Sequence, residues 1–130
     1  MKRLIIASNE LPVQIERAGN IFDIKPADEL KYSGLTGFYE QFDARWVGHA
    51  EVKITSGTDE EKQLQTALDR YHCCLVDGDP EIIRFAVNGF AGSTLWPLLH
   101  YNPSIVQYDD DMWNAYVRFN RMYAEKIGKM

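Results

Sequence analysis

Apolar residues in this sequence form short runs that alternate with stretches of helical periodicity. Residues 4–7, 45–48 and 73–76 are largely apolar, which is typical of strands buried in a parallel sheet. Between the second and third runs, apolar residues recur at the spacing of one helix face: Leu64, Ala67, Leu68 and Tyr71. Strands that alternate with helices predict an α/β fold, here a Rossmann-like three-layer sandwich with a mainly parallel sheet.

A β-hairpin is predicted after the first strand. Residues 13–16 and 21–24 alternate between apolar and polar side chains. The connection between them contains Gly19 and Asn20, residue types that tolerate the positive φ of tight turns. We therefore expect an N-terminal hairpin that decorates the sheet.

Turn and capping signals predict the next elements. Residues 26–31 have the composition of a loop, and residues 38–42 that of a helix. Residues 51–55 alternate, and we expect them to extend or flank the second core strand. Thr58 and Glu61 have the spacing of a capping box at the start of the following helix.

The C-terminal part is predicted to be helical. Residues 80–90 form one expected helix, and another is expected to begin at residues 95–97, because Pro97 suits a first helical turn. The run of carboxylates at 109–111 favours the N-terminus of the last helix and is interpreted as a solvated cap. That helix carries aromatic side chains on more than one face, so one face is expected to pack on the sheet and another against a partner or further sequence.

Composition excludes several classes of protein. The 130 residues are 45% hydrophobic and 25% charged, and the net charge is -5, which predicts one globular domain over 1–130 and binding to neither nucleic acid nor an anionic membrane. No apolar run reaches the length of a membrane span, and no signal peptide is evident. Cys73 and Cys74 are adjacent and read as reduced, buried thiols, so a cytoplasmic location is expected.

The stretch 88–101 has the densest glycine and aromatic content of the chain. One interpretation is structural: Phe90 and Trp96 are core anchors beside a helix start at Pro97. The other interpretation comes from the order of its residues, Asn-Gly-Phe-Ala-Gly-Ser-Thr-Leu-Trp-Pro-Leu-Leu-His-Tyr.

This stretch resembles the Asn-Gly-Phe-Ser-Asn-x-x-Leu-Trp-Pro-x-x-His-Tyr signature of trehalose-6-phosphate synthases. Residues 3–12 are similar to the family's opening strand, which ends Ser-Asn-Arg-Leu-Pro, and residues 46–49 to its Trp-x-Gly-Trp. Residues 113–125 resemble its helix with Trp-x-x-Tyr-x-x-x-Asn. Because the four segments keep the family's order across nearly the whole chain, the resemblance implies family membership.

The resemblance implies a fold and a reaction. Enzymes of this family have the GT-B fold, with two Rossmann-type domains facing across a cleft. They transfer glucose from UDP-glucose to glucose 6-phosphate with retention of configuration, and they use no metal or other cofactor. The chain is similar to the first part of the acceptor-holding N-terminal domain, so a nucleotide-binding domain and catalytic residues are not expected in it.

The positions that touch substrate in the family fall, by resemblance, on Glu10, Gly34, His49, Val87 and Trp96. Glu10 stands where the family has an arginine that grips the acceptor phosphate, so the interaction changes sign. Gly34 keeps the second glycine of a pair whose first member is serine here. His49 replaces a tryptophan, and Val87 replaces a tyrosine that touches the phosphate.

No other constellation predicts a chemistry. The three histidines are far apart in sequence, and His72 next to two cysteines lacks the spacing of metal ligands. We therefore expect no metal.

Three functional hypotheses remain. The chain is a segment of a synthase-like glucosyltransferase that is inactive alone, or a pseudoenzyme that self-associates or docks to a true synthase. In the third hypothesis it binds a small molecule, a neutral sugar or a cation rather than a sugar phosphate, through Trp96, Glu10 and His49.

Overall fold

The computed structural model describes residues 1–27, 38, 41–55 and 57–130. The chain divides into two compact units, Met1–Asp77 and Gly78–Met130, which we call unit 1 and unit 2 and describe each by itself. The expectation of a single domain over 1–130 stays a prediction. Gly34, residues 28–31 of the predicted loop and residues 39–40 of the predicted helix lie outside the described residues.

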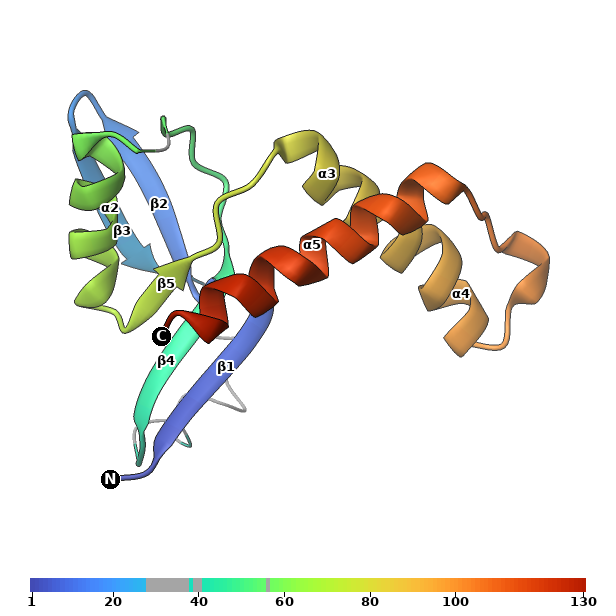
Figure 1. Ribbon diagram of the computed structural model, residues 1–130, viewed down its shortest axis with the longest axis horizontal. Coiled ribbons are helices and arrows are strands. Elements are labelled where there is room, and N and C mark those ends of the chain that lie inside the picture. The colour runs from blue at the N-terminus through green and yellow to red at the C-terminus, as the bar shows by residue number, and fades with distance from the viewer. Residues whose placement is uncertain (28–37, 39–40, 56) are drawn as a thin grey trace. The chain divides into compact units, whose positions relative to one another are not determined.

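Unit 1 contains a three-stranded parallel sheet in the order β1-β4-β5 (Figure 1). These strands are β1 (Arg3–Glu10), β4 (Asp43–His49) and β5 (Cys73–Leu75). The predicted parallel sheet is therefore confirmed. Burial increases from the edge strand β1, where Leu4, Ile5 and Ile6 are half-buried, to the central β4, where Trp46 and Val47 are buried, because a central strand has neighbours on both sides.

The predicted hairpin is also confirmed. It consists of β2 (Val13–Ala18) and β3 (Ile21–Pro26), which pair antiparallel with Ala18 opposite Ile21. The turn between them has Gly19 at φ 63°, a conformation that glycine adopts without steric cost. Arg17 forms an ion pair with Glu60 and also donates to the Lys53 carbonyl oxygen at 3.1 Å, which fixes the hairpin to the segments that follow the sheet.

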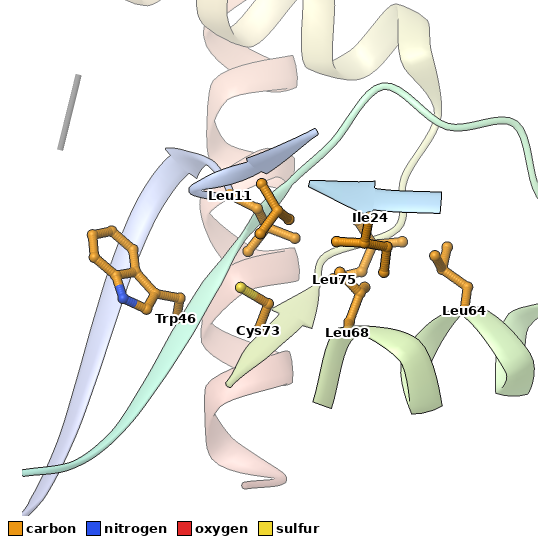
Figure 2. Packing of buried hydrophobic residues seen from close by; sticks show 8 residues of the cluster. Leu11, Ile24, Trp46, Leu64, Leu68, Cys73 and Leu75 are labelled. Carbon is orange, nitrogen blue, oxygen red and sulfur yellow. The ribbon is translucent and has the colours of Figure 1, made fainter. Parts of the chain in front are cut away.

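The core of unit 1 lies between the sheet, the hairpin and the helix α2 (Asp59–Asp69). Leu64 and Leu68 of α2 are fully buried beside Ile24 of the hairpin and Leu75 of β5 (Figure 2). The 3.6-residue periodicity of the sequence placed these leucines on one face, as predicted. Truncating one such leucine to alanine costs about 2–5 kcal/mol in a packed core.

Two local details of unit 1 differ from the predictions. Residues 51–55 have no regular secondary structure, so they do not extend β4 as a strand; Val52 and Ile54 instead pack against the core cluster that includes Trp46 of β4. The capping box at α2 does not form. Thr58 is the N-cap residue but donates its hydroxyl to the Thr55 carbonyl at 2.5 Å, and Glu61 accepts from the backbone N–H of Gly57 at 2.5 Å. The two side chains tighten the turn before the helix instead.

Unit 2 is helical. Its elements are α3 (Pro80–Arg84), the π-helix η1 (Phe85–Leu95), α4 (Trp96–Leu99), the 3-10 helix η2 (Pro103–Ile105) and α5 (Asp110–Gly128). Asp109 caps α5 by accepting from the N–H groups of Asp111 at 2.7 Å and Met112 at 3.3 Å. The acidic run is therefore a helix cap, as predicted.

An α-helix, α4, begins at Trp96 with Pro97 in its first turn, as predicted, but no break separates it from the element before it. Helical backbone continues from α3 through η1 into α4, and Leu95 keeps right-handed helical φ and ψ. Pro97 lies inside this run and has no N–H to donate to the preceding turn. The backbone N–H of Gln107 donates to the Ser93 carbonyl of that turn at 2.8 Å, so a later segment supplies a donor there.

In the described part of the chain, none of the helices combines the length and apolar character needed to cross a bilayer.

Candidate functional site

The carboxyl edge of the parallel sheet in unit 1 holds two of the predicted site residues. Glu10 ends β1 and His49 ends β4, and their Cα atoms are partners in the strand register. Glu10 is exposed and His49 is half-buried. Ligands of open α/β sheets bind outside the carboxyl ends of the strands, so these two side chains lie where the fold class places a ligand.

Gly48 explains why the two strand ends come so close. A Cβ atom at this position would lie 2.9 Å from the backbone nitrogen of Leu11, 3.0 Å from the carbonyl carbon of Glu10 and 3.1 Å from the carbonyl oxygen of Ser8. All three are backbone atoms, so they cannot move aside as a flexible side chain can. Because Gly48 has no side chain, the backbone at the irregular end of β1 can approach β4 closely. There the N–H of Leu11 donates to the His49 carbonyl at 2.8 Å.

The His49 ring faces the end of β5. Its Nδ1 atom lies 3.4 Å from the carbonyl oxygen of Val76, a contact that is a hydrogen bond when Nδ1 carries the proton. The N–H of Val76 in turn donates to the Gly48 carbonyl at 2.8 Å. The imidazole is thus held by the sheet, and its other nitrogen remains available as an acceptor in that tautomer.

In unit 2, the Asn-Gly-Phe part of the motif packs η1 against α5. A Cβ atom on Gly89 would lie 2.9 Å from the Cγ atom of Met112. Phe90 is 7% exposed, and its ring lies 5.1 Å from that of Trp113 and 4.8 Å from that of Tyr116. The prediction that Phe90 is a core anchor is therefore confirmed. Val87, one turn earlier on η1, is half-buried.

Trp96 is not a core residue. Its side chain is 64% exposed and stacks on the ring of His100, with centroids 3.9 Å apart and planes at 27°. The Nδ1 atom of His100 lies 2.7 Å from the Trp96 carbonyl oxygen, which holds the imidazole parallel to the indole. The structural interpretation of Trp96 is thus corrected: the indole is a supported aromatic surface that faces solvent within unit 2.

Two residues that the sequence did not single out position this surface. Thr94 is buried and donates its hydroxyl to the Gln107 carbonyl, while the N–H of Gln107 donates to the Ser93 carbonyl. This reciprocal pair ties the helix just before Trp96 to the segment that leads into α5. The signal was present in Pro97, because a proline inside a helix has no N–H to donate to the preceding turn, which then needs another donor.

The pKa shifts of the described residues do not indicate an activated nucleophile in these segments. Burial raises the pKa of the Cys73 thiol to about 12, so it stays protonated and unreactive at neutral pH. The hydrogen bond from Tyr108 to Asp110, 3.0 Å long, raises the pKa of that phenol. Among the described residues no group of three or more histidine, cysteine, aspartate or glutamate side chains is arranged to hold a metal ion.

The predicted site residues therefore fall into three sets. Glu10 and His49 lie together on the sheet edge of unit 1. Val87 and Trp96 lie on the continuous helical run of unit 2. Gly34 lies outside the described residues. The assignment of these residues to a substrate stays a prediction.

Comparison with known proteins agrees with the motifs. The family model described as Glycosyltransferase family 20 matches residues 2–130. The UDP-forming alpha,alpha-trehalose-phosphate synthase 1 of Aspergillus fumigatus is 32% identical over 130 residues, covering 98% of this chain and 25% of the relative. The synthase of Schizosaccharomyces pombe is 34% identical, with the same coverage. Synthase A of Dictyostelium discoideum is 32% identical and is covered over 17% of its length.

The chain thus spans about a quarter or less of the length of the curated relatives that it matches. The match to the family model nevertheless runs over nearly every residue, and it includes both the sheet edge of unit 1 and the aromatic surface of unit 2. On this evidence the chain belongs to glycosyltransferase family 20.

Proposed function

We propose that this chain is a segment of a trehalose-6-phosphate synthase-like glycosyltransferase. It keeps the aromatic surface that contacts the acceptor sugar and has lost the residue types that bind the acceptor phosphate. The observation that carries the proposal is the exposure of Trp96, 64%, in a motif whose neighbours Phe90 and Pro97 are buried. A tryptophan that is mostly exposed, and whose ring is supported by a stacked histidine, is suited to contact a ligand.

The chemistry of the aromatic surface fits a sugar. The face of an indole is apolar and electron-rich, and the axial C–H groups of a hexose ring pack against such a face. The stack with His100 fixes the orientation of the indole before any ligand arrives, so less side-chain entropy is lost on binding.

The chemistry of the substituted residues does not fit a phosphate. The carboxylate of Glu10 repels a phosphate dianion by about 1 kcal/mol for each pair of unit charges 4 Å apart in water. Val87 offers no hydrogen-bonding group in its side chain. The net charge of -5 adds a further general repulsion. Glu10 acts at the sheet edge of unit 1, whereas Val87 lies on the helical run of unit 2 that carries Trp96. We therefore infer that a neutral hexose binds better than its 6-phosphate at the aromatic surface of unit 2.

Transfer of glucose by this chain alone is not part of the proposal. A glycosyl transfer needs donor and acceptor held together in a near-attack geometry. The relatives that carry the name synthase are about four times longer than the matched region. The proposed activity, transfer of glucose from UDP-glucose to an acceptor, belongs to a complete enzyme of this kind, and the segment contributes acceptor-side surface to it.

An NMR titration tests the proposal with an internal control. The chain has three tryptophans, so their indole N–H signals report separately on Trp46, Trp96 and Trp113. Saturable shifts of the Trp96 signal with glucose, smaller shifts with glucose 6-phosphate, and none at Trp46 would support the proposal. Equal shifts at all three indoles, or a stronger response to glucose 6-phosphate, would contradict it.

A second candidate function has its own support. The chain is then a non-catalytic pseudoenzyme that self-associates or docks to a true synthase. The observation that favours it is a group of exposed apolar side chains directly after Trp96, on α4 and η2. Surface of this kind is typical of sites where proteins associate.

A further inference from the structure

His100 is the C-cap residue of α4, and its side chain is exposed. Its backbone N–H donates to the Trp96 carbonyl at 3.1 Å, and its Nδ1 atom lies 2.7 Å from the same oxygen. The imidazole therefore folds back over the end of the helix and stacks on the indole of Trp96, with ring centroids 3.9 Å apart. One nitrogen and one face of the imidazole are thus occupied within the helix.

The backbone that carries His100 is also held in place. The N–H of Asn102 donates to the Pro97 carbonyl at 2.8 Å, and that of Tyr101 donates to the Leu98 carbonyl at 3.3 Å. These two hydrogen bonds, with Tyr101 at φ 57°, close the end of α4 as a Schellman motif. The imidazole thus extends from a fixed turn, and it needs little further ordering when a ligand binds.

The contact with the Trp96 carbonyl decides which ring nitrogen of His100 carries the proton. A carbonyl oxygen can only accept, so Nδ1 donates; without its proton, two lone pairs would face each other at 2.7 Å. In the neutral ring Nε2 is then an acceptor. The two nitrogens lie on different sides of the ring, so Nε2 points away from the helix backbone. The described residues supply no hydrogen bond to it.

Much of the indole beside the imidazole is open. Trp96 is 64% exposed although His100 stacks on it, because an imidazole is smaller than an indole. A ligand ring that packs on the uncovered part of that face lies roughly in the plane of the imidazole, which is also the plane of the Nε2 lone pair. Residues 85–108 contain no aspartate, glutamate, lysine or arginine, so no charged side chain of this stretch competes for the ligand.

An apolar ring face beside one acceptor is suited to a polyol. A hexose presents C–H groups to the aromatic face and hydroxyl groups at its rim, and each hydroxyl can donate a hydrogen bond. We propose that His100 is a ligand-binding residue of the aromatic surface, and that its Nε2 atom accepts a hydrogen bond from a hydroxyl group of the sugar that packs on Trp96. This inference rests on the proposed function and adds to it a requirement for a hydroxyl donor.

The ¹⁵N signals of the imidazole test the proposal on the complete chain. At about pH 8, where an imidazole is neutral, the free chain should show His100 with the proton on Nδ1 and none on Nε2. Glucose is expected to shift the Nε2 signal of His100 together with the indole signal of Trp96. A proton on Nε2 in the free chain would overturn the proposal, and so would an Nε2 signal that stays in place while the Trp96 signal shifts.

A variant and a modified sugar separate the hydrogen bond from the stack. His100→Phe keeps a ring that can stack on the indole but removes the acceptor, so glucose should bind about threefold to tenfold more weakly. Glucose with all hydroxyl groups methylated has no donor and should bind the wild-type chain and the variant equally. His72→Phe is the matched control, because His72 is also exposed and belongs to unit 1.

The possible outcomes distinguish this inference from the proposed function. Full affinity of His100→Phe for glucose would overturn the inference, as would an equal loss for glucose and methylated glucose or an equal loss in His72→Phe. Dispersed amide spectra of both variants exclude unfolding as the cause. A Trp96 signal that does not respond to glucose would refute the sugar surface and the His100 contact together. A Trp96 response without an Nε2 response would refute only the contact.

Discussion

The two units keep the family's motif residues for different physical reasons. In unit 1, Trp46 and Gly48 are buried, and both are needed to pack β4 against its neighbours. In unit 2, Trp96, His100 and Tyr101 are exposed, although they belong to the most recognisable stretch of the sequence. Motif residues of the first kind are explained by folding. Those of the second kind are not explained by burial, and we propose that Trp96 is kept for contact with a ligand.

The largest expected difference in the free energy of unfolding is between substitutions of two tryptophans. Trp46 is 1% exposed and Trp96 is 64% exposed, so the comparison predicts opposite outcomes for the same substitution. Trp46→Ala should cost about 3–5 kcal/mol of unfolding free energy or prevent folding altogether. Trp96→Ala should cost less than about 0.5 kcal/mol. Urea unfolding followed by circular dichroism measures both, and similar losses would remove the distinction.

Two glycine substitutions, one at the sheet edge and one control, test the packing around Gly48. Gly48→Ala introduces a Cβ atom 2.9 Å from a backbone nitrogen, and the forced backbone shift should cost about 1–3 kcal/mol. Gly128→Ala is the control, because no atom lies within 4 Å of the added Cβ and the residue ends α5. That change should be neutral or slightly stabilising. Equal effects in thermal unfolding would mean that Gly48 has no packing role.

The hydrogen bond between Thr94 and Gln107 is expected to have a smaller effect on the free energy of unfolding. Thr94→Ala removes the hydroxyl that donates to the Gln107 carbonyl and should cost about 1 kcal/mol. Ser93→Ala removes only a hydrogen bond, 3.0 Å long, to the Asn88 carbonyl among exposed groups and should cost about half as much or less. Only Thr94→Ala is expected to shift the Trp96 indole signal. A shift of that signal in both variants would contradict the positioning role of Thr94.

The smallest expected effect concerns Tyr108. Its hydrogen bond to Asp110 raises the pKa of the phenol above the ordinary value of 10.0. The contribution of this bond to stability is present below pH 10 and is lost as the pH rises through the folded-state pKa. Asp110→Asn should bring the pKa back toward its ordinary value in an ultraviolet titration of tyrosine absorbance. An unchanged titration curve would exclude the hydrogen bond as the cause.

The periodic elements of unit 1 could be predicted because their patterns are strong and local. Leu64 and Leu68 recur at helical spacing, and Gly19 marks the hairpin turn. The capping box at Thr58 could not be decided locally, because two nearby turn groups compete for the same side chains. Residues 51–55 alternate like a strand, but a strand also needs a partner, which no local pattern supplies.

The site could be predicted less completely than the fold. The resemblance pointed to Glu10 and His49, and the strand register places them together. The residue pattern alone left the exposure of Trp96 undecided, because an aromatic residue beside a proline is as typical of a core as of a surface, and only the resemblance placed it in contact with substrate. Thr94 was missed because its partner, Gln107, is 13 residues away and no pattern connects them.

The most direct test of the account restores one phosphate-binding group within unit 2. Val87→Tyr returns the residue type that the family has at this position, on the same continuous helical run as Trp96, and it replaces neither ring of the stack of Trp96 on His100. The account predicts that this variant binds glucose 6-phosphate about tenfold more tightly than the wild-type chain, while its affinity for glucose stays the same. An unchanged affinity for glucose 6-phosphate in a folded variant would contradict the claim that this substitution weakened binding of the acceptor phosphate.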